Sequence, residues 1–259
     1  MTFEVQIADL IAQLDTYLWP FIRIGAFVMV MPVVGSSFVP TRVRLLLACT
    51  LTLLMAPVLP YEVQQPFLSL SGVLMVLQEL AIGIVMGFAM QIVFDAITLG
   101  GQVIAMSMGL GFAVFLDRAR GVSIPVLGQL FLMLAMLVFL SLDGHLALIE
   151  LVARSFVILP IGEGGLSTQS LRAILEWSAQ IFDVAVKIAL PAISALIVVN
   201  LSFGVMSRAA PTLNLFAVGF PVAMLLGFVV IFLSMGTLQE NVASLLRSTL
   251  ATLPSLLSP

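Results

Sequence analysis

One stretch of this chain decides its fold class: residues 72–100 read GVLMVLQELAIGIVMGFAMQIVFDAITLG. Within them, only Glu79 and Asp95 carry a charge at neutral pH. An α-helix rises about 1.5 Å per residue, so this stretch would be roughly 43 Å long, whereas the hydrocarbon core of a bilayer is about 30 Å thick. The pattern predicts a membrane-type helix that is too long for a simple crossing.

The composition of the whole chain excludes an ordinary soluble domain. Of its 259 residues, 61% are hydrophobic and 9% are charged, whereas soluble proteins carry about 25% charged residues. The 13 acidic and 10 basic residues give a net charge of −3, which argues against a nucleic-acid partner because such a partner needs a basic face. Membrane lipid or partner subunits must therefore cover most of the surface.

Six hydrophobic segments have the length and composition of membrane helices. They are residues 17–34, 43–59, 74–93, 126–142, 181–200 and 213–235. A backbone in lipid must satisfy its own polar groups, so all six are expected to be helical. The predicted fold class is an all-α membrane protein built from long helical hairpins.

Three further helical features follow from the pattern. Residues 171–206 are predicted to form one helix with a kink at Pro191. Residues 143–159 are apolar enough either to prolong the fourth helix or to form a short re-entrant helix. The tail after Met235 mixes polar and apolar residues, which favours an interfacial helix.

The residues that enzymes use are largely missing. His145 is the sole histidine and Cys49 the sole cysteine, so neither a histidine-rich zinc site nor a thiolate cluster is expected. The sequence has no P-loop and no GxSxG motif. We therefore expect no catalytic activity, no cofactor and no metal.

Charged residues inside apolar segments are costly, so they are candidates for function. Arg23 and Glu79 each interrupt an apolar run, and they either pair with each other, pair with a partner subunit or serve transport. Asp183 and Lys187 stand four residues apart, where they can neutralise each other on one helix face. An ion pathway through them is the alternative.

A polar stripe continues the opening stretch. Gln91, Asp95, Thr98 and Gln102 fall within about 60° on a helical wheel, which indicates either a wet or protein-lined interior or a helix end outside the membrane. Gly83 and Gly87 upstream form a small-xxx-small step, which permits close approach of another helix.

Two connecting segments complete the candidates. Met, Gly and Phe residues dominate residues 105–115, which residues 116–121 follow, and they give an adaptable apolar surface, either a buried connector or a surface that closes a pore. The corner at residues 208–221 contains Arg208, Asn214 and Pro221, and its residues suit a sharp turn between two helices.

Several motifs of this chain, in this order and spacing, resemble the FliR/SctT family of type III export-gate proteins, and its flagellar members in particular. One departure is Asp117-Arg118, where many relatives have Asp-Pro. The matching residues are Arg23-Ile24-Gly25-Ala26, Val39-Pro40-Thr41-Arg42-Val43-Arg44, Glu79-Leu80-Ala81-Ile82-Gly83, Met108-Gly109-Leu110-Gly111-Phe112-Ala113, Asp143-Gly144-His145 and the corner at residues 208–221.

The resemblance implies a core subunit of a gate in the bacterial inner membrane and flagellar basal body, through which unfolded subunits are exported. Its expected partners are FliP, FliQ and FlhB, and part of the assembled gate is expected on the periplasmic side. About residues 1–160 would be a FliP-like part, including a plug loop at 106–121, and residues 161–259 a FliQ-like hairpin and tail.

The resemblance also implies roles for individual residues. The plug of the closed pore would be formed by Met106, Met108, Gly109, Leu110, Gly111, Phe112 and Phe115. Buried polar or assembly roles would fall to Arg23, Glu79, Gln91, Asp95, Gln102, Asp183, Lys187, Arg208, Asn214 and Pro221.

Two other classes of function are weighed against the gate. A secondary transporter would use Arg23, Glu79, Asp183 and Lys187 as an ion or solute site at the bilayer midplane, but the chain has no recognisable inverted repeat. An intramembrane enzyme would need a nucleophile with a base, and no convincing pair is present.

Overall fold

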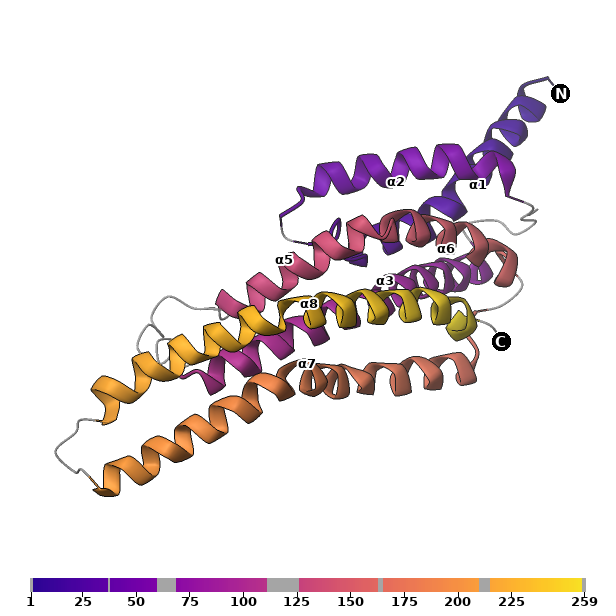
Figure 1. Ribbon diagram of the computed structural model, residues 1–259. Coiled ribbons are helices and arrows are strands. Elements are labelled where there is room, and N and C mark those ends of the chain that lie inside the picture. The colour runs from indigo at the N-terminus through magenta and orange to yellow at the C-terminus, as the bar shows by residue number, and fades with distance from the viewer. Residues whose placement is uncertain are drawn as a thin grey trace. The chain divides into compact units, whose positions relative to one another are not determined.

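The computed structural model describes residues 2–36, 38–59, 69–110, 126–162, 165–209 and 215–257. In these ranges, the apolar segments satisfy the hydrogen bonds of their backbone by forming helices. Within these ranges the structure contains helices and no strand (Figure 1). The long helices are α1 (Thr2–Val30), α2 (Thr41–Met55), α3 (Leu70–Ser107), α5 (Val126–Ser141), α6 (Gly144–Ile158), α7 (Thr168–Ala209) and α8 (Leu215–Leu257), and a short 3-10 helix covers Ala56–Val58.

The prediction of an all-α membrane protein is confirmed. Among the described residues, four helices are long and apolar enough to cross a membrane, or up to five if α5 and α6 are one broken span. The first predicted segment, residues 17–34, ends earlier than expected, because α1 ends at Val30. The helix ends there because Pro32 follows and Val33 adopts a φ of 69°.

The opening stretch forms a helix longer than predicted. Residues 72–100 lie inside the 38 residues of α3, which continues through Gly100 and Gly101 although glycine weakens isolated helices. A Cβ atom at Gly100 would lie 3.0 Å from Cγ2 of Ile188, and one at Gly101 would lie 2.9 Å from the carbonyl oxygen of Leu127. These glycines therefore serve close helix packing, which outweighs their low helix propensity.

The end of the chain is helical, as predicted, and it has no break from the apolar segment before it. The tail after Met235 continues the same helix, α8, as far as Leu257. Helix α7 is continuous over 42 residues with Pro191 inside it. Residues 143–159 form a helix of their own rather than a prolongation of the fourth, since Asp143 takes a left-handed φ of 55° between α5 and α6.

The chain divides into two units, each with its own packing. Unit 1 comprises residues 1–92, 143–178 and 248–259, and unit 2 comprises residues 93–142 and 179–247. In unit 1, α1 packs against α2, and Nε1 of Trp177 in α7 donates a hydrogen bond of 3.3 Å to the carbonyl oxygen of Ala89 in α3.

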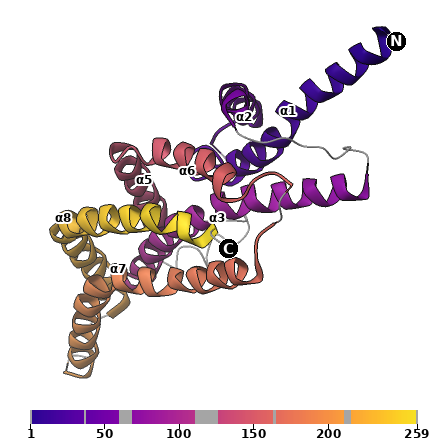
Figure 2. The same ribbon diagram turned by 90° about the vertical axis from the view of Figure 1, so that its right-hand side faces the viewer.

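Unit 2 is held by contacts among α3, α5, α7 and α8. Phe94 of α3 and Phe139 of α5 meet edge to face, with ring centroids 5.5 Å apart. The parts of α7 and α8 in this unit lie side by side as an antiparallel hairpin in both views (Figures 1 and 2).

Candidate functional site

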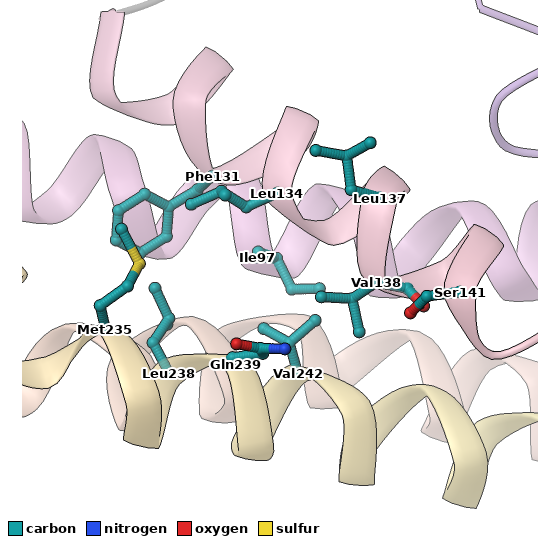
Figure 3. Close-up of a pocket in the computed structure, with 10 residues that line it drawn as sticks. All are labelled: Ile97, Phe131, Leu134, Leu137, Val138, Ser141, Met235, Leu238, Gln239 and Val242. Atoms are coloured by element: carbon teal, nitrogen blue, oxygen red, sulfur yellow. The ribbon is translucent and has the colours of Figure 1, made fainter.

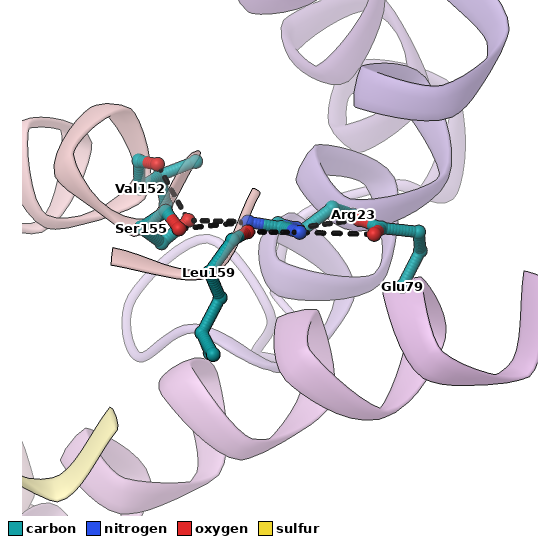
Figure 4. A network of polar contacts seen from close by, with 5 residues as sticks. All are labelled: Arg23, Glu79, Val152, Ser155 and Leu159. Carbon is teal, nitrogen blue, oxygen red and sulfur yellow. Dashed lines mark hydrogen bonds and ion pairs between the residues drawn. The ribbon is translucent and has the colours of Figure 1, made fainter. Parts of the chain in front are cut away.

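A buried ion pair in unit 1 is the most elaborate polar cluster among the described residues (Figure 4). Arg23 of α1 and Glu79 of α3 are 0% and 2% exposed. Nε of Arg23 lies 2.5 Å from Oε2 of Glu79, and Nη2 lies 2.9 Å from Oε1. The pairing is therefore bidentate, the strongest form of arginine–carboxylate contact.

Helix α6 completes the surroundings of the Arg23 guanidinium. Nη1 donates to the carbonyl oxygen of Ser155 at 3.0 Å and to its Oγ at 3.3 Å, and Nη2 donates to the carbonyl oxygen of Leu159 at 2.9 Å. The Phe156 ring centroid lies 4.3 Å from Cζ of Arg23, a cation–π distance. Arg23 therefore joins three helices that are remote in the sequence.

The local sequence explains how α1 reaches α3 so closely. Trp19, Arg23 and Phe27 recur every four residues on the buried face of α1. A Cβ atom at Gly83 would lie 2.8 Å from Cβ of Ala26, and one at Gly87 would lie 3.0 Å from the backbone nitrogen of Met31. The close helix approach predicted from the Gly83/Gly87 step is confirmed.

The geometry of this cluster suits structure better than transport. A guanidinium has five N–H donors, and Arg23 makes five hydrogen bonds. Because both charges are buried and the arginine donors are used, binding a solute would require breaking existing bonds. Of the alternatives that the sequence left open for Arg23 and Glu79, the structure shows the two residues paired with each other.

Asp183 and Lys187 form a different kind of pair, in unit 2. Nζ of Lys187 lies 2.6 Å from Oδ2 of Asp183, and the two side chains are 72% and 60% exposed. The four residues of the transporter alternative thus form two separate neutral pairs, one buried and one exposed. Exposed pairs of this kind contribute at most about 1 kcal/mol.

The polar stripe of α3 is mixed in its exposure. Asp95 is exposed, whereas Gln91, Thr98 and Gln102 are half-buried. Oγ1 of Thr98 donates to the carbonyl oxygen of Phe94 at 2.7 Å. Gly128 of α5 faces this stripe, since a Cβ atom there would lie 2.9 Å from Cγ of Gln102. At its Gln102 end, therefore, the stripe packs partly against α5.

The first part of the predicted plug is the end of helix α3. The N–H of Leu110 donates to the carbonyl oxygen of Ala105, and that of Gly109 to Met106, each at 3.0 Å. Gly109 has a φ of 83°. This is the Schellman arrangement, in which a left-handed glycine ends a helix, so Gly109 has a structural reason to be glycine.

The two methionines at this helix end point to different surroundings. Met106 is 66% exposed, whereas Met108 is 1% exposed. A Cβ atom at Gly227 of α8 would lie 2.5 Å from Cγ and 2.7 Å from Sδ of Met108. Met108 therefore fills a notch that exists because residue 227 has no side chain. The other predicted plug residues, Gly111, Phe112 and Phe115, lie outside the described residues.

The corner between α7 and α8 is only partly described. Arg208 is exposed in the last turn of α7, where a cation interacts favourably with the negative end of the helix dipole. Pro221 is exposed near the start of α8. Asn214 lies outside the described residues.

Unit 2 also contains an apolar cavity of about 350 Å³ between α5 and α8, with Ile97 of α3 at its floor (Figure 3). The residues that line it carry no charge: Ile97, Phe131, Leu134, Leu137, Val138, Ser141, Met235, Leu238, Gln239 and Val242. Without a titratable group, the cavity has no means of acid–base catalysis. Within the described ranges, no group of three His, Cys, Asp or Glu residues could hold a metal ion.

Sequence reasoning missed the partners that α6 and α8 supply. Ser155, Phe156 and Leu159 complete the Arg23 site, mostly through backbone carbonyl oxygens, which no side-chain pattern reveals. Gly227 is likewise a single glycine in an apolar run. The helix end at Gly109 could have been found, because glycine after a helical run is a known stop signal.

Comparison with known proteins gives matches over nearly the full chain. A family model described as bacterial export proteins, family 1, matches residues 14–249. The flagellar biosynthetic protein FliR of Pectobacterium carotovorum subsp. carotovorum is 37% identical over 219 residues, 85% of this chain and 84% of that protein. FliR of Escherichia coli (strain K12) is 38% identical over 214 residues, 83% and 82% of the two chains. FliR of Bacillus subtilis (strain 168) is 26% identical over 251 residues, 93% and 94% of the two chains.

Proposed function

Because the chain belongs to the family of bacterial export proteins, family 1, we propose that it is a core subunit of the flagellar type III protein export gate. The observation that carries the proposal is the similarity to proteins named flagellar biosynthetic protein FliR, at 37% and 38% identity over 85% and 83% of the chain. In this proposal the protein resides in the bacterial inner membrane, within the flagellar basal body, and part of the assembled gate stands on the periplasmic side.

The proposed assembly contains FliP and FliQ, with FlhB associated. Residues 1–160 act as a FliP-like part and residues 161–259 as a FliQ-like hairpin and tail. Support comes from the exposed apolar surface of the long helices, since only 22% of the residues in an apolar 18-residue stretch of α7 and 17% of those in such a stretch of α8 are buried. Such surface needs lipid or other subunits to cover it.

Co-purification tests this assembly. The full-length chain carries an affinity tag in a flagellated host, and the detergent extract is analysed for FliP, FliQ and FlhB. We expect all three with the wild type, and less FliP and FliQ with Arg208→Ala or Asn214→Ala. Arg154→Ala is the matched control, because Arg154 is exposed and pairs with Glu150 along its own helix. A stable chain without partners that moves a solute would instead establish the transporter alternative.

The proposed mechanism is passive gating. An unfolded subunit threads the pore, and the central loop at residues 106–121 closes the pore against ions when no substrate is present. Methionine, glycine and phenylalanine suit this role because they pack against varied surfaces without charged or directional contacts. The energy for export comes from other components, since the sequence has no P-loop.

Ion leakage tests the plug. Deletion of residues 109–112 should make membranes that contain the assembled gate permeable to small ions. Gly25→Ala is the control and should leave the membranes tight, because Gly25 lies in α1, outside the loop, and nothing lies within 4 Å of a Cβ atom there. Tight membranes with the deletion, in the presence of normal assembly, would remove the plug from the mechanism.

A further inference from the structure

The turn that follows α1 in unit 1 holds a valine in a strained conformation. Val33 has a φ of 69°, and a β-branched residue rarely adopts a positive φ because its side chain crowds the backbone. The N–H of Val34 donates to the carbonyl oxygen of Pro32 at 2.9 Å, so Val33 stands at the centre of a three-residue turn. A γ-turn with a positive φ is rare and strained. Such strain persists only where the surrounding structure enforces it.

The backbone folds back tightly after this turn. The N–H of Gly35 donates to the carbonyl oxygen of Met31 at 2.8 Å. A Cβ atom at Gly35 would lie 2.5 Å from the same oxygen and 2.8 Å from the carbonyl oxygen of Met29. Residue 35 therefore lies directly against the end of α1, where a side chain would collide with backbone atoms.

Arg44 of α2 fastens the next part of the connection. Its Nη2 donates to the carbonyl oxygen of Ser36 at 2.5 Å, and its Nε donates to that of Val39 at 3.1 Å. Oγ of Ser36 in turn donates to the carbonyl oxygen of Val33 at 2.7 Å. A chain of hydrogen bonds thus leads from the Arg44 guanidinium to the strained residue.

The position of Arg44 would otherwise disfavour a cation. It lies near the start of α2, where the helix dipole has its positive end. The N-cap residue, Pro40, contributes no side-chain hydrogen bond to this helix end. The two hydrogen bonds to carbonyl oxygens offset this unfavourable placement, and they give an arginine at position 44 a structural reason.

Helix α2 itself is weakly embedded in unit 1. Its buried residues are Ala48 and Thr52, whereas Leu46 and Leu54 are each 67% exposed. An element with few buried side chains opens at low cost in free energy. The hydrogen bonds of Arg44 therefore contribute a large share of what holds the start of α2 in place.

We propose that Arg44 and the turn at residues 31–36 form a latch with two states. In the closed state, which the structure shows, Arg44 holds the carbonyl oxygens of Ser36 and Val39 while Val33 is strained. In the released state both hydrogen bonds are broken, Val33 relaxes to a negative φ, and the start of α2 moves away from α1. The hydrogen bonds of one charged group and the strain of one residue are comparable in free energy, so the two states are nearly balanced. The latch lets α2 move while the rest of unit 1 stays folded.

Two neighbouring valines test the strain. Val33 and Val34 are both half-buried, but only Val33 has a positive φ. Val33→Gly should raise the apparent melting temperature of the full-length chain in detergent by about 2 °C or more, because glycine adopts this conformation without strain. Val34→Gly should lower it, because glycine there only loses more backbone entropy on folding. A fall of similar size in both variants would show that position 33 stores no strain, and the latch would be rejected.

Distances between spin labels measure the two states directly. Leu46 of α2 and Val157 of α6 are each 67% exposed and belong to unit 1. Both are replaced by cysteine in a full-length Cys49→Ser chain, spin-labelled and studied in detergent by pulsed electron paramagnetic resonance. A pair at Ile84 of α3 and Val157 is the reference, and it should keep one distance in every variant because neither helix belongs to the latch.

Arg44→Lys should raise the population at the second distance of the Leu46–Val157 pair at least threefold, because an ammonium group lacks the planar fork that holds two carbonyl oxygens. Arg42→Lys is the matched control, since Arg42 is exposed near the start of the same helix, and it should leave the distances unchanged. Val33→Gly added to Arg44→Lys should restore the closed population, because the closed state then carries no strain.

A distance distribution that is the same for Arg44→Lys and Arg42→Lys would make Arg44 a static brace and would overturn the latch. A double variant that is released as often as Arg44→Lys alone would uncouple Arg44 from Val33 and would also overturn it. If Arg44→Lys does not fold, the comparison of Val33→Gly with Val34→Gly still decides. No partner subunit is present in these measurements, so their outcome is separate from that of the proposed export gate.

Discussion

At the scale of residues, loss of one partner of the Arg23–Glu79 pair should cost far more stability than loss of both. Both side chains are buried, so removal of one partner leaves a charge in an apolar interior. Such a loss typically costs about 3–5 kcal/mol, whereas replacement of both partners by apolar residues is often neutral. The pair therefore specifies how α1, α3 and α6 meet, even if its net contribution to stability is small.

A double-mutant cycle measures this asymmetry. Arg23→Met should lower the apparent melting temperature in detergent markedly, because Glu79 is left unpaired. Arg23→Met combined with Glu79→Leu should recover much of the loss. The measurement is the fraction of protein that stays monodisperse after heating. Arg154→Met is the control and should have little effect, because Arg154 belongs to an exposed ion pair. Additive losses in the double variant would show that the two charges do not stabilise each other.

At the scale of elements, glycines determine where helices can approach. The atoms nearest to a Cβ at Gly83 include the backbone carbonyl oxygen of Arg23 and the backbone nitrogen of Phe27. Backbone atoms in a helix cannot move aside as a flexible side chain can. The small-xxx-small step on α3 thus determines the distance between α3 and α1.

Gly83→Ala should therefore destabilise unit 1 by about 1–3 kcal/mol, the usual range for an overpacked contact. Gly25→Ala is the matched control on the partner helix, because nothing lies within 4 Å of a Cβ atom there. Alanine at position 25 should be neutral or stabilising, since it favours helix. Resistance to heating in detergent compares the two, and equal behaviour would contradict the role of Gly83.

In unit 2, Gly227 likewise allows close packing, because Met108 occupies the space that a side chain at position 227 would fill. Gly227→Ala should displace Met108 and reduce thermal stability, whereas Gly236→Ala, on the same helix with open space around it, should not. Met108→Ala added to Gly227→Ala should restore part of the loss by making room. If the double variant is no more stable than Gly227→Ala alone, the notch does not hold Met108.

At the scale of the whole molecule, the chain leaves much apolar surface uncovered. Phe182, Leu201, Phe232 and Leu233 are between 68% and 78% exposed. In the proposed gate, lipid and partner subunits cover this surface. The chain should therefore depend on its partners for stability in the cell.

Co-production tests this dependence. The steady-state amount of the full-length chain should rise several-fold when FliP and FliQ are produced with it, because an unpartnered chain with exposed apolar surface is removed by proteolysis. Immunoblotting of membranes at equal transcript level is the measurement. A chain that accumulates equally well alone would favour a self-sufficient protein.

Sequence alone determined the helical fold class, the membrane setting and the Gly83/Gly87 approach of helices. These properties depend on composition and on spacing within one segment, because a helix satisfies its backbone locally and glycine leaves room wherever it stands. The apolar runs at residues 72–100 and 171–206 are accordingly helical, although the helix that contains the first of these runs, α3, extends to Ser107.

Tertiary structure alone decided which partners each polar residue meets. Arg23 and Glu79 are 56 residues apart in the chain, and Arg23 also binds the carbonyl oxygen of Leu159, 136 residues away. Such pairings depend on how whole helices pack, and backbone acceptors have no sequence signature. For the same reason, only the structure shows that Gly109 ends helix α3 and that Met108 fills a notch on α8.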